Sequence, residues 1–104
     1  MSTQPIRIRA RVTGELTEVT MLVVHPMETG LRKDASGAQI PAHYITDLSV
    51  GTEGRTVLEA RMSQAVARDP LISFRFRGGR RGDRITVNWT DSSGAQRQGD
   101  AIVA

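Results

Sequence analysis

Apolar and polar residues alternate along most of this chain, in short runs that are separated by glycine-rich or polar turns. In the first run, every second residue from Ile6 to Val12 is apolar, and the residues between them are arginines. A period of two predicts a β-strand that has one face in a hydrophobic core and the other in water. The same pattern predicts seven strands, near residues 6–12, 17–25, 44–50, 55–60, 71–77, 84–90 and 96–103.

Seven short strands without a convincing helical pattern favour an all-β fold. We expect a single immunoglobulin-like antiparallel β-sandwich of about seven strands, in one domain over residues 1–104. Two stretches interrupt the pattern. Residues 26–42 form a long loop, which in so small a domain is usually functional or mobile. Residues 61–70 form either a short helix or a crossover, which Asp69-Pro70 ends because the residue before a proline avoids the helical conformation.

The second predicted strand departs from simple alternation, because residues 21–24 are apolar on both faces. The outer face of an antiparallel sandwich strand is normally polar. Leu22 and Val24 therefore lie either under the long loop or against another protein. We expect a partner surface that includes Leu22 and Val24, with Met27, Leu31 and Arg32 of the long loop as its rim.

The size and composition of the chain exclude several kinds of chemistry. It has 104 residues, a mass of 11.4 kDa and no cysteine, which rules out a disulfide, a thiolate nucleophile and a thiolate-ligated metal. A core of this size leaves little room for a deep catalytic cavity. Ser63, His43 and Asp47 combine into a triad only arbitrarily, because no motif presents a nucleophile. We expect no enzyme activity, no catalytic residue and no cofactor.

The basic residues suggest an anionic partner only weakly, since the net charge is +3. Lys33 is the only lysine, and arginines cluster at positions 7–11 and 75–84. One alternative is therefore a small arginine-rich β-domain that binds nucleic acid or another polyanion. Nucleic-acid binding normally uses aromatic side chains for stacking. Because Phe74, Phe76 and Trp89 fall on the inward phase of their strands, a solvated arginine face is favoured, and an anionic protein partner is the next interpretation.

The two histidines, His25 and His43, offer a further alternative, a copper-binding β-sandwich that also uses Met27. Two histidines without cysteine and with few nearby carboxylates make a weak metal-binding pattern. We expect no metal, and expect both histidines to bond to backbone or solvent.

The long loop carries a family resemblance. Residues 25–34 read His-Pro-Met-Glu-Thr-Gly-Leu-Arg-Lys-Asp and are followed by Gly37 and by Ile-Pro-Ala-His-Tyr-Ile at 40–45. This stretch resembles the SoxZ family, the small non-catalytic subunits of the sulfur-oxidation (Sox) carrier complex. Further matches are Ile6–Ala10, Asp69-Pro70, Gly82-Asp83, and Trp89 with Asp91 and Gly94. The resemblance covers nearly the whole chain.

The resemblance implies a scaffold subunit in thiosulfate or sulfur-compound oxidation. Its partner in a heterodimer would be a SoxY-type subunit, which holds the sulfur intermediate on its own cysteine, and it would meet other Sox enzymes transiently. The absence of cysteine agrees with these roles of the two subunits, because a chain without cysteine cannot hold a thiol adduct itself. Neither nucleic acid nor membrane is an expected partner, and the implied compartment is the periplasm. Because residues 1–9 contain no apolar run, we expect co-export with a signal-bearing partner.

Overall fold

Seven β-strands form the protein in the computed structural model, which describes residues 6–104. They are β1 (Ile6–Thr13), β2 (Leu16–Val23), β3 (Ile45–Thr52), β4 (Arg55–Arg61), β5 (Leu71–Arg77), β6 (Arg84–Asp91) and β7 (Gln96–Ile102). These bounds confirm the seven predicted strands. The expectation about export rests partly on residues 1–5, which lie outside the described residues. The described part of the chain contains no helix that could cross a membrane.

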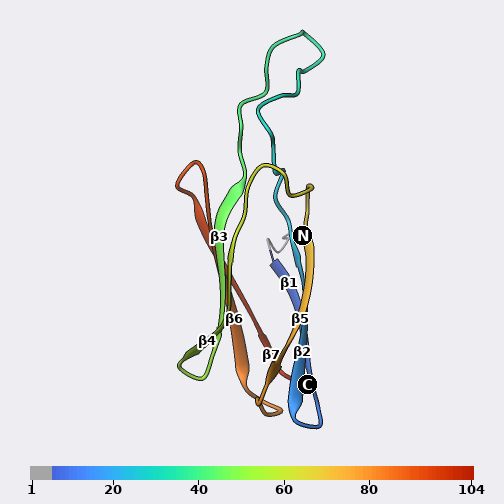
Figure 1. Ribbon diagram of the computed structural model, residues 1–104, viewed down its shortest axis with the longest axis vertical. Coiled ribbons are helices and arrows are strands. Elements are labelled where there is room, and N and C mark those ends of the chain that lie inside the picture. The colour runs from blue at the N-terminus through green and yellow to red at the C-terminus, as the bar shows by residue number, and fades with distance from the viewer. Residues whose placement is uncertain (1–5) are drawn as a thin grey trace, which may run out of the picture.

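The strands form two antiparallel sheets that face each other (Figure 1). One sheet has the order β1-β2-β5 and the other has the order β4-β3-β6-β7. The chain passes from one sheet to the other between β2 and β3, between β4 and β5, and between β5 and β6. This arrangement confirms the predicted immunoglobulin-like β-sandwich.

The core consists of the alternating inward positions of both sheets. Val19, Met21 and Val23 of β2 are almost fully buried, as are Ile85 and Val87 of β6. Burying each such side chain contributes about 1.5–3 kcal/mol, so the alternation visible in the sequence drives the pairing of the sheets. The inward phase of the aromatic residues is also confirmed, because Trp89 is buried and Phe74 and Phe76 are half-buried against the core.

The connection from β4 to β5 is a crossover without a helix, so the predicted alternative of a short helix is wrong. It contains one backbone turn, in which the Val66 N–H donates to the Ser63 carbonyl (3.1 Å), and its last residues bond to the end of β2. The Asp69 N–H donates to the carbonyl of His25 (3.0 Å), and the Val23 N–H donates to the carbonyl of Pro70 (3.0 Å). The half-buried side chain of Val66 packs against the core. These tertiary contacts replace the hydrogen bonds that a helix would have made.

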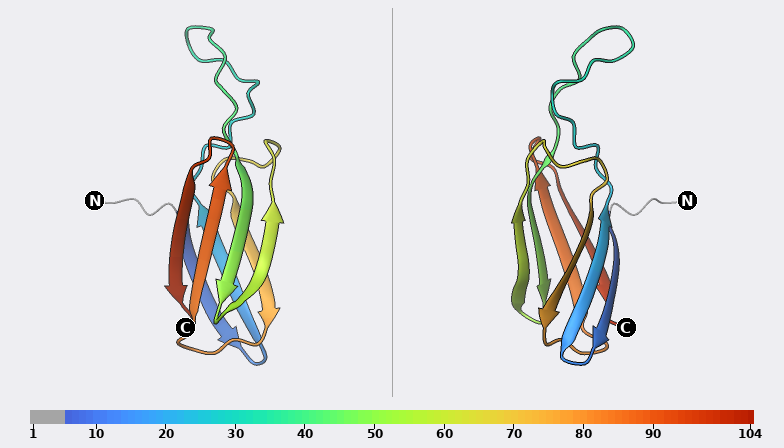
Figure 2. Two further views of the ribbon diagram at one scale, coloured as in Figure 1. Left: turned by 90° about the vertical axis from the view of Figure 1, so that its left-hand side faces the viewer. Right: turned by 45° about the vertical axis from the view of Figure 1, so that its right-hand side comes forward.

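The long loop leaves one end of the sandwich and projects away from both sheets (Figures 1 and 2). We call residues 28–43 the arm, and the end of the sandwich from which they leave the arm end. The two halves of the arm pair at Glu28 and His43 and again at Lys33 and Gln39. Because the arm extends away from the sandwich, it does not cover Val24, which is 36% exposed. The alternative in which the loop shields the apolar outer residues of β2 is therefore wrong for Val24.

Candidate functional site

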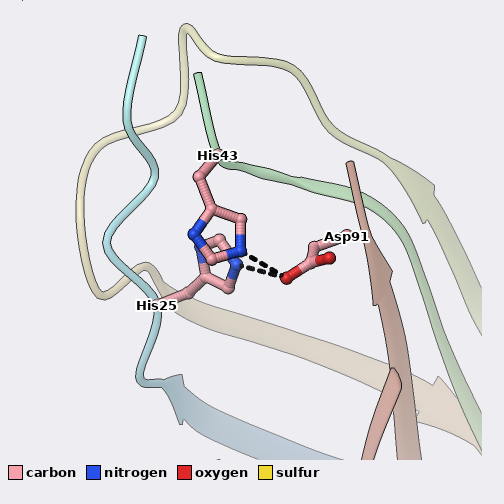
Figure 3. Close-up of side chains that lie close together, drawn as sticks. All are labelled: His25, His43 and Asp91. Carbon is pink, nitrogen blue, oxygen red and sulfur yellow. Dashed lines mark hydrogen bonds and ion pairs between the residues drawn. The ribbon is translucent and has the colours of Figure 1, made fainter. Parts of the chain in front are cut away.

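Three polar side chains meet at the base of the arm. His25 follows β2, His43 precedes β3, and Asp91 is the last residue of β6. Both histidine Nε2 atoms lie against the same carboxylate oxygen, Oδ2 of Asp91, at 3.1 Å for His25 and 2.8 Å for His43 (Figure 3). The His25 and Asp91 side chains are 2% exposed, whereas that of His43 is 40% exposed. The cluster forms because β2, β3 and β6 all begin or end at the arm end.

The second carboxylate oxygen of Asp91 shapes the turn into β7. Oδ1 accepts hydrogen bonds from the N–H of Ser93 (3.0 Å), its hydroxyl (2.6 Å) and the N–H of Ala95 (3.0 Å). Burial raises the pKa of Asp91, but the hydrogen bonds from Ser93, His25, His43 and Ala95 lower it by more. The net result is a pKa well below the usual value for an aspartate. Asp91 is therefore a buried carboxylate that keeps its negative charge.

The hydrogen bonds of His25 fix its tautomer. Its Nδ1 accepts the N–H of Met27 (3.1 Å), so the ring proton is on Nε2 and is donated to Asp91. The ring also meets Trp89 edge-on, with centroids 5.1 Å apart. Its backbone N–H donates to Oδ1 of Asp69 in the crossover (2.9 Å). His25 thus joins β2, the crossover and β6.

The spacing of the cluster suits a metal ion, but its proton positions do not. One ligand atom from each of His25, His43 and Asp91 lies within 4.8 Å of the others. Binding through Nε2 of His25 would move its proton to Nδ1, where it would face the Met27 N–H instead of an acceptor. Histidine ligands normally donate that second N–H to an acceptor. The Met27 sulfur, which the copper alternative needs, is buried and accepts the N–H of Ile45 (3.3 Å). The residues present therefore do not fit the proposed copper site.

His43 is the one member of the cluster that faces a cleft. The cleft has a volume of about 400 Å³, and its lining is Glu28, Ile40, Pro41, Ala42, His43, Ser92 and Ser93. Among the described residues, Nδ1 of His43 has no hydrogen-bond partner. The nearby hydroxyls are engaged elsewhere, since Ser92 Oγ accepts the Tyr44 N–H and Ser93 Oγ donates to Asp91. The site thus has an oriented histidine but no activated nucleophile beside it.

The arbitrary catalytic triad considered from the sequence does not assemble. His43 bonds to Asp91, the Ser63 hydroxyl accepts the N–H of Ala65, and Asp47 lies near Arg61 (3.9 Å). The expectation that both histidines bond to backbone or solvent is wrong for their Nε2 atoms, because both contact the carboxylate of Asp91. Of the ring nitrogens, only Nδ1 of His25 bonds to backbone within residues 6–104, at the Met27 N–H. Sequence reasoning thus missed Asp91, the shared partner. The available signal was an aspartate that ends a strand and opens a Ser-Ser-Gly turn, because such residues often accept nearby backbone N–H groups.

The five residues expected at a partner surface lie in different environments. Leu31 on the arm is 84% exposed, and Leu22 is half-buried on the outer face of β2. The Arg32 guanidinium donates to both carboxylate oxygens of Glu28. Met27 is only 5% exposed and belongs to the core, so its expected place on the rim is wrong. Its side chain supports the arm from beneath instead of lining a surface.

The fold and the cluster define a small immunoglobulin-like β-sandwich with a projecting arm fastened by two histidines and an aspartate. Among solved structures, it is similar to a superoxide reductase in the oxidized state, at 16% identity and a TM-score of 0.63 over 97% of this chain and 88% of that chain. It is also similar to the hypothetical protein PH1083 from Pyrococcus horikoshii OT3, at 15% identity and a TM-score of 0.64 over 95% and 87%. At such identities, the similarity extends to the fold alone.

A comparison with curated protein sequences found no significant match. The model of the family described as sulphur oxidation protein SoxZ matches residues 6–101, which is nearly the whole chain. This protein belongs to the SoxZ family, as the resemblance of the arm and its flanking residues predicted. It is therefore a subunit of a Sox sulfur-oxidation system.

Proposed function

We propose that this chain is the non-catalytic scaffold of a sulfur carrier heterodimer. Its partner is a SoxY-type subunit, which holds the sulfur intermediate on a cysteine during the oxidation of thiosulfate or related compounds. The observation that carries the proposal is a sulfur-oxidation family match over residues 6–101 in a chain without cysteine. Such a chain cannot form the thiol adduct, so another polypeptide must hold it.

The site geometry supports a structural role for the cluster. His25, His43 and Asp91 bond to one another and to the backbone around the base of the arm, and no nucleophile among the described residues is activated by His43. The arrangement holds both ends of the arm at the same edge of the sandwich. An arm fixed at its base and exposed along its length is suited to contact with another chain.

The partner surface that we propose includes apolar side chains at the arm end and on the arm itself. Val24 follows β2, Leu22 lies on its outer face, and Leu31 is exposed near the middle of the arm. Arg32 beside Leu31 supplies a polar rim. Apolar anchors surrounded by polar residues are typical of protein interfaces. Other Sox enzymes would meet the assembled pair transiently.

The proposed compartment is the periplasm, which the chain would reach together with its signal-bearing partner. Cell fractionation of a host that expresses the chain with and without the carrier subunit tests this. We expect the chain in the periplasm only when the carrier subunit is present. Periplasmic accumulation of the chain alone would contradict the co-export proposal.

A retention experiment tests the partnership itself. The purified, tagged chain is immobilised and mixed with the SoxY-type subunit from the same host, either as the natural protein or with its cysteine replaced by serine. We expect equal retention of both, because scaffold binding does not need the thiol. Retention of neither form would refute the partnership, and retention that depends on the cysteine would refute a purely scaffolding role.

A further inference from the structure

The outer face of the β1-β2-β5 sheet is lined by arginines. Side chains of β1 and β5 alternate, so that one set enters the core and the other set points outward. We call the outer surface of this sheet the arginine face, and its arginines are Arg7, Arg9, Arg11, Arg75 and Arg77. All five are exposed. They flank β2 from both sides, since the strand pairing places Arg11 and Arg75 on either side of Glu18.

Few carboxylates balance this charge. Glu18 bonds to Arg11 (3.3 Å), and Glu15 pairs with Arg77 (3.2 Å). Within residues 6–104, no carboxylate lies at ion-pair distance from Arg7, Arg9 or Arg75. The middle row holds Thr20 and Ser73, whose hydroxyls are 3.2 Å apart. The face therefore has an excess of positive charge that the protein itself does not neutralise.

The arginine face becomes apolar toward the arm end. There, strand pairing places Leu22 of β2 between Arg7 and Leu71 of β5. Leu71 is 68% exposed, and Val24 continues the apolar surface beyond the end of β2. An apolar end on a guanidinium-rich face matches the composition of protein interfaces, in which arginine is enriched and lysine is depleted.

The same face lacks the features that nucleic acid uses. The two phenylalanines of β5, Phe74 and Phe76, belong to the inward set and pack against the core. The exposed large hydrophobic side chains of the described chain are aliphatic, namely Val24, Leu31, Leu71 and Ile102. Proteins that bind single strands without sequence preference normally stack the bases on aromatic side chains beside the phosphate contacts. Guanidinium pairs bidentately with carboxylates as well as with phosphates, so a face without exposed aromatic rings favours an acidic protein surface.

We propose that the arginine face is the docking surface for an acidic surface of the carrier subunit, with Leu22 and Leu71 as apolar contacts at one end. The proposal rests on the proposed function, because it names where and by what chemistry that partner binds. Arg7, Arg9 and Arg75 supply the charges that steer the approach, since they have no carboxylate partner within the described chain. Their attraction for the partner is screened by salt.

The test is a charge reversal with a matched control. Arg9→Glu/Arg75→Glu alters the arginine face, whereas Arg81→Glu/Arg97→Glu makes the same change in net charge on the loop after β5 and on β7. All four residues are exposed, so both variants should stay folded at room temperature. Arg75→Glu places a second carboxylate opposite Glu18 and should lower the thermal midpoint slightly. Surface plasmon resonance against the purified SoxY-type subunit, in about 50 and 300 mM salt, gives the association rates.

We expect Arg9→Glu/Arg75→Glu to associate about 10-fold or more slowly in low salt, with the control close to the natural protein. Added salt should slow the association of the natural protein and have less effect on the association of the Arg9→Glu/Arg75→Glu variant. If all three proteins associate at the same rate in both salt concentrations, docking does not use the arginine face, although the partnership itself is supported. If the natural protein does not bind the SoxY-type subunit, both the partnership and the docking surface are refuted. The proposal would also be overturned if the natural protein bound a single-stranded DNA probe through Arg9 and Arg75 and did not bind the carrier subunit.

Discussion

The Nε2 atom of His43 lies 2.8 Å from Oδ2 of Asp91, so the start of β3 is tied to the end of β6 at the base of the arm. The same oxygen also accepts a hydrogen bond from Nε2 of His25, which follows β2. One buried carboxylate therefore fixes both chain segments that lead into the arm. The other oxygen holds the turn between β6 and β7. Several consequences of this arrangement can be measured.

Replacement of Asp91 by alanine should destabilise the protein. It removes the acceptor of the buried His25 Nε2–H and of the N–H groups of Ser93 and Ala95. Leaving a buried donor unsatisfied costs about 1–3 kcal/mol, and we expect a loss near the upper end because two partly buried N–H groups lose their acceptor as well. Urea unfolding gives the free energy of unfolding. Asp47→Ala serves as a control, because that side chain is 62% exposed, and should cost less than about 0.5 kcal/mol.

Acid should destabilise the protein through Asp91. Its pKa is lower in the folded protein than in the unfolded chain, where it is about 3.9. The unfolded chain therefore takes up a proton at higher pH than the folded protein does. The stabilisation by this carboxylate is complete above about pH 5 and is lost progressively as the pH falls toward the folded pKa. The free energy of unfolding should fall across this range.

The variant Asp91→Asn identifies the residue responsible, since its amide does not titrate. Its free energy of unfolding should change less between about pH 5 and pH 3 than that of the natural protein. The pKa values of Glu28 and Asp34 are also lowered, by Arg32 and by hydrogen bonds from Ser36 respectively. Both groups are on the exposed arm, so Asp34→Asn should keep most of the natural pH dependence. Identical pH profiles for Asp91→Asn and the natural protein would contradict this assignment.

Metal binding should be absent at the cluster. The Met27 N–H keeps the proton of His25 on Nε2, and a bound cation would disrupt that hydrogen bond. Isothermal titration with Zn²⁺ and Cu²⁺, followed by dialysis and elemental analysis, should detect no stoichiometric metal. Retained metal that is lost in Asp91→Ala and in a His43→Ala variant would show that the cluster is a metal site.

Leu31 should contribute to partner binding without contributing to stability. Its side chain is 84% exposed on the arm, so Leu31→Asp should leave the thermal midpoint unchanged. We expect binding to the carrier subunit to weaken by about 10-fold, which corresponds to about 1.4 kcal/mol. Ile102→Asp is a matched control, because Ile102 is 55% exposed near the chain's end on β7. Equal affinities for the two variants would remove Leu31 from the proposed interface.

The strands could be predicted from the sequence because a period of two follows directly from β-strand geometry. The alternation from Ile6 to Val12 and from Ile85 to Trp89 predicted both the strands and the side of each strand that is buried. The same local reasoning failed for residues 61–70. Their conformation depends on hydrogen bonds to the end of β2, which no local pattern reveals.

The cluster could be predicted only in part. The two histidines were visible as candidate residues, but their partner depends on the register of β3 with β6, which pairs Ile45 with Asp91. Met27 was misplaced because it lies at the start of the long loop, between exposed Pro26 and half-buried Glu28, whereas its own side chain turns into the core. Its backbone φ of 47° lies in the left-handed region, which sequence patterns rarely indicate for methionine.

We propose that this SoxZ-family chain works as the scaffold of a cysteine-bearing carrier subunit. The most direct measurement is native mass spectrometry of the complex that co-purifies with the tagged chain from its own host. We predict a one-to-one heterodimer with the SoxY-type subunit, and a sulfur adduct mass on that subunit alone after exposure to thiosulfate and the other Sox proteins. Recovery of the chain by itself, or bound to nucleic acid, would contradict the account.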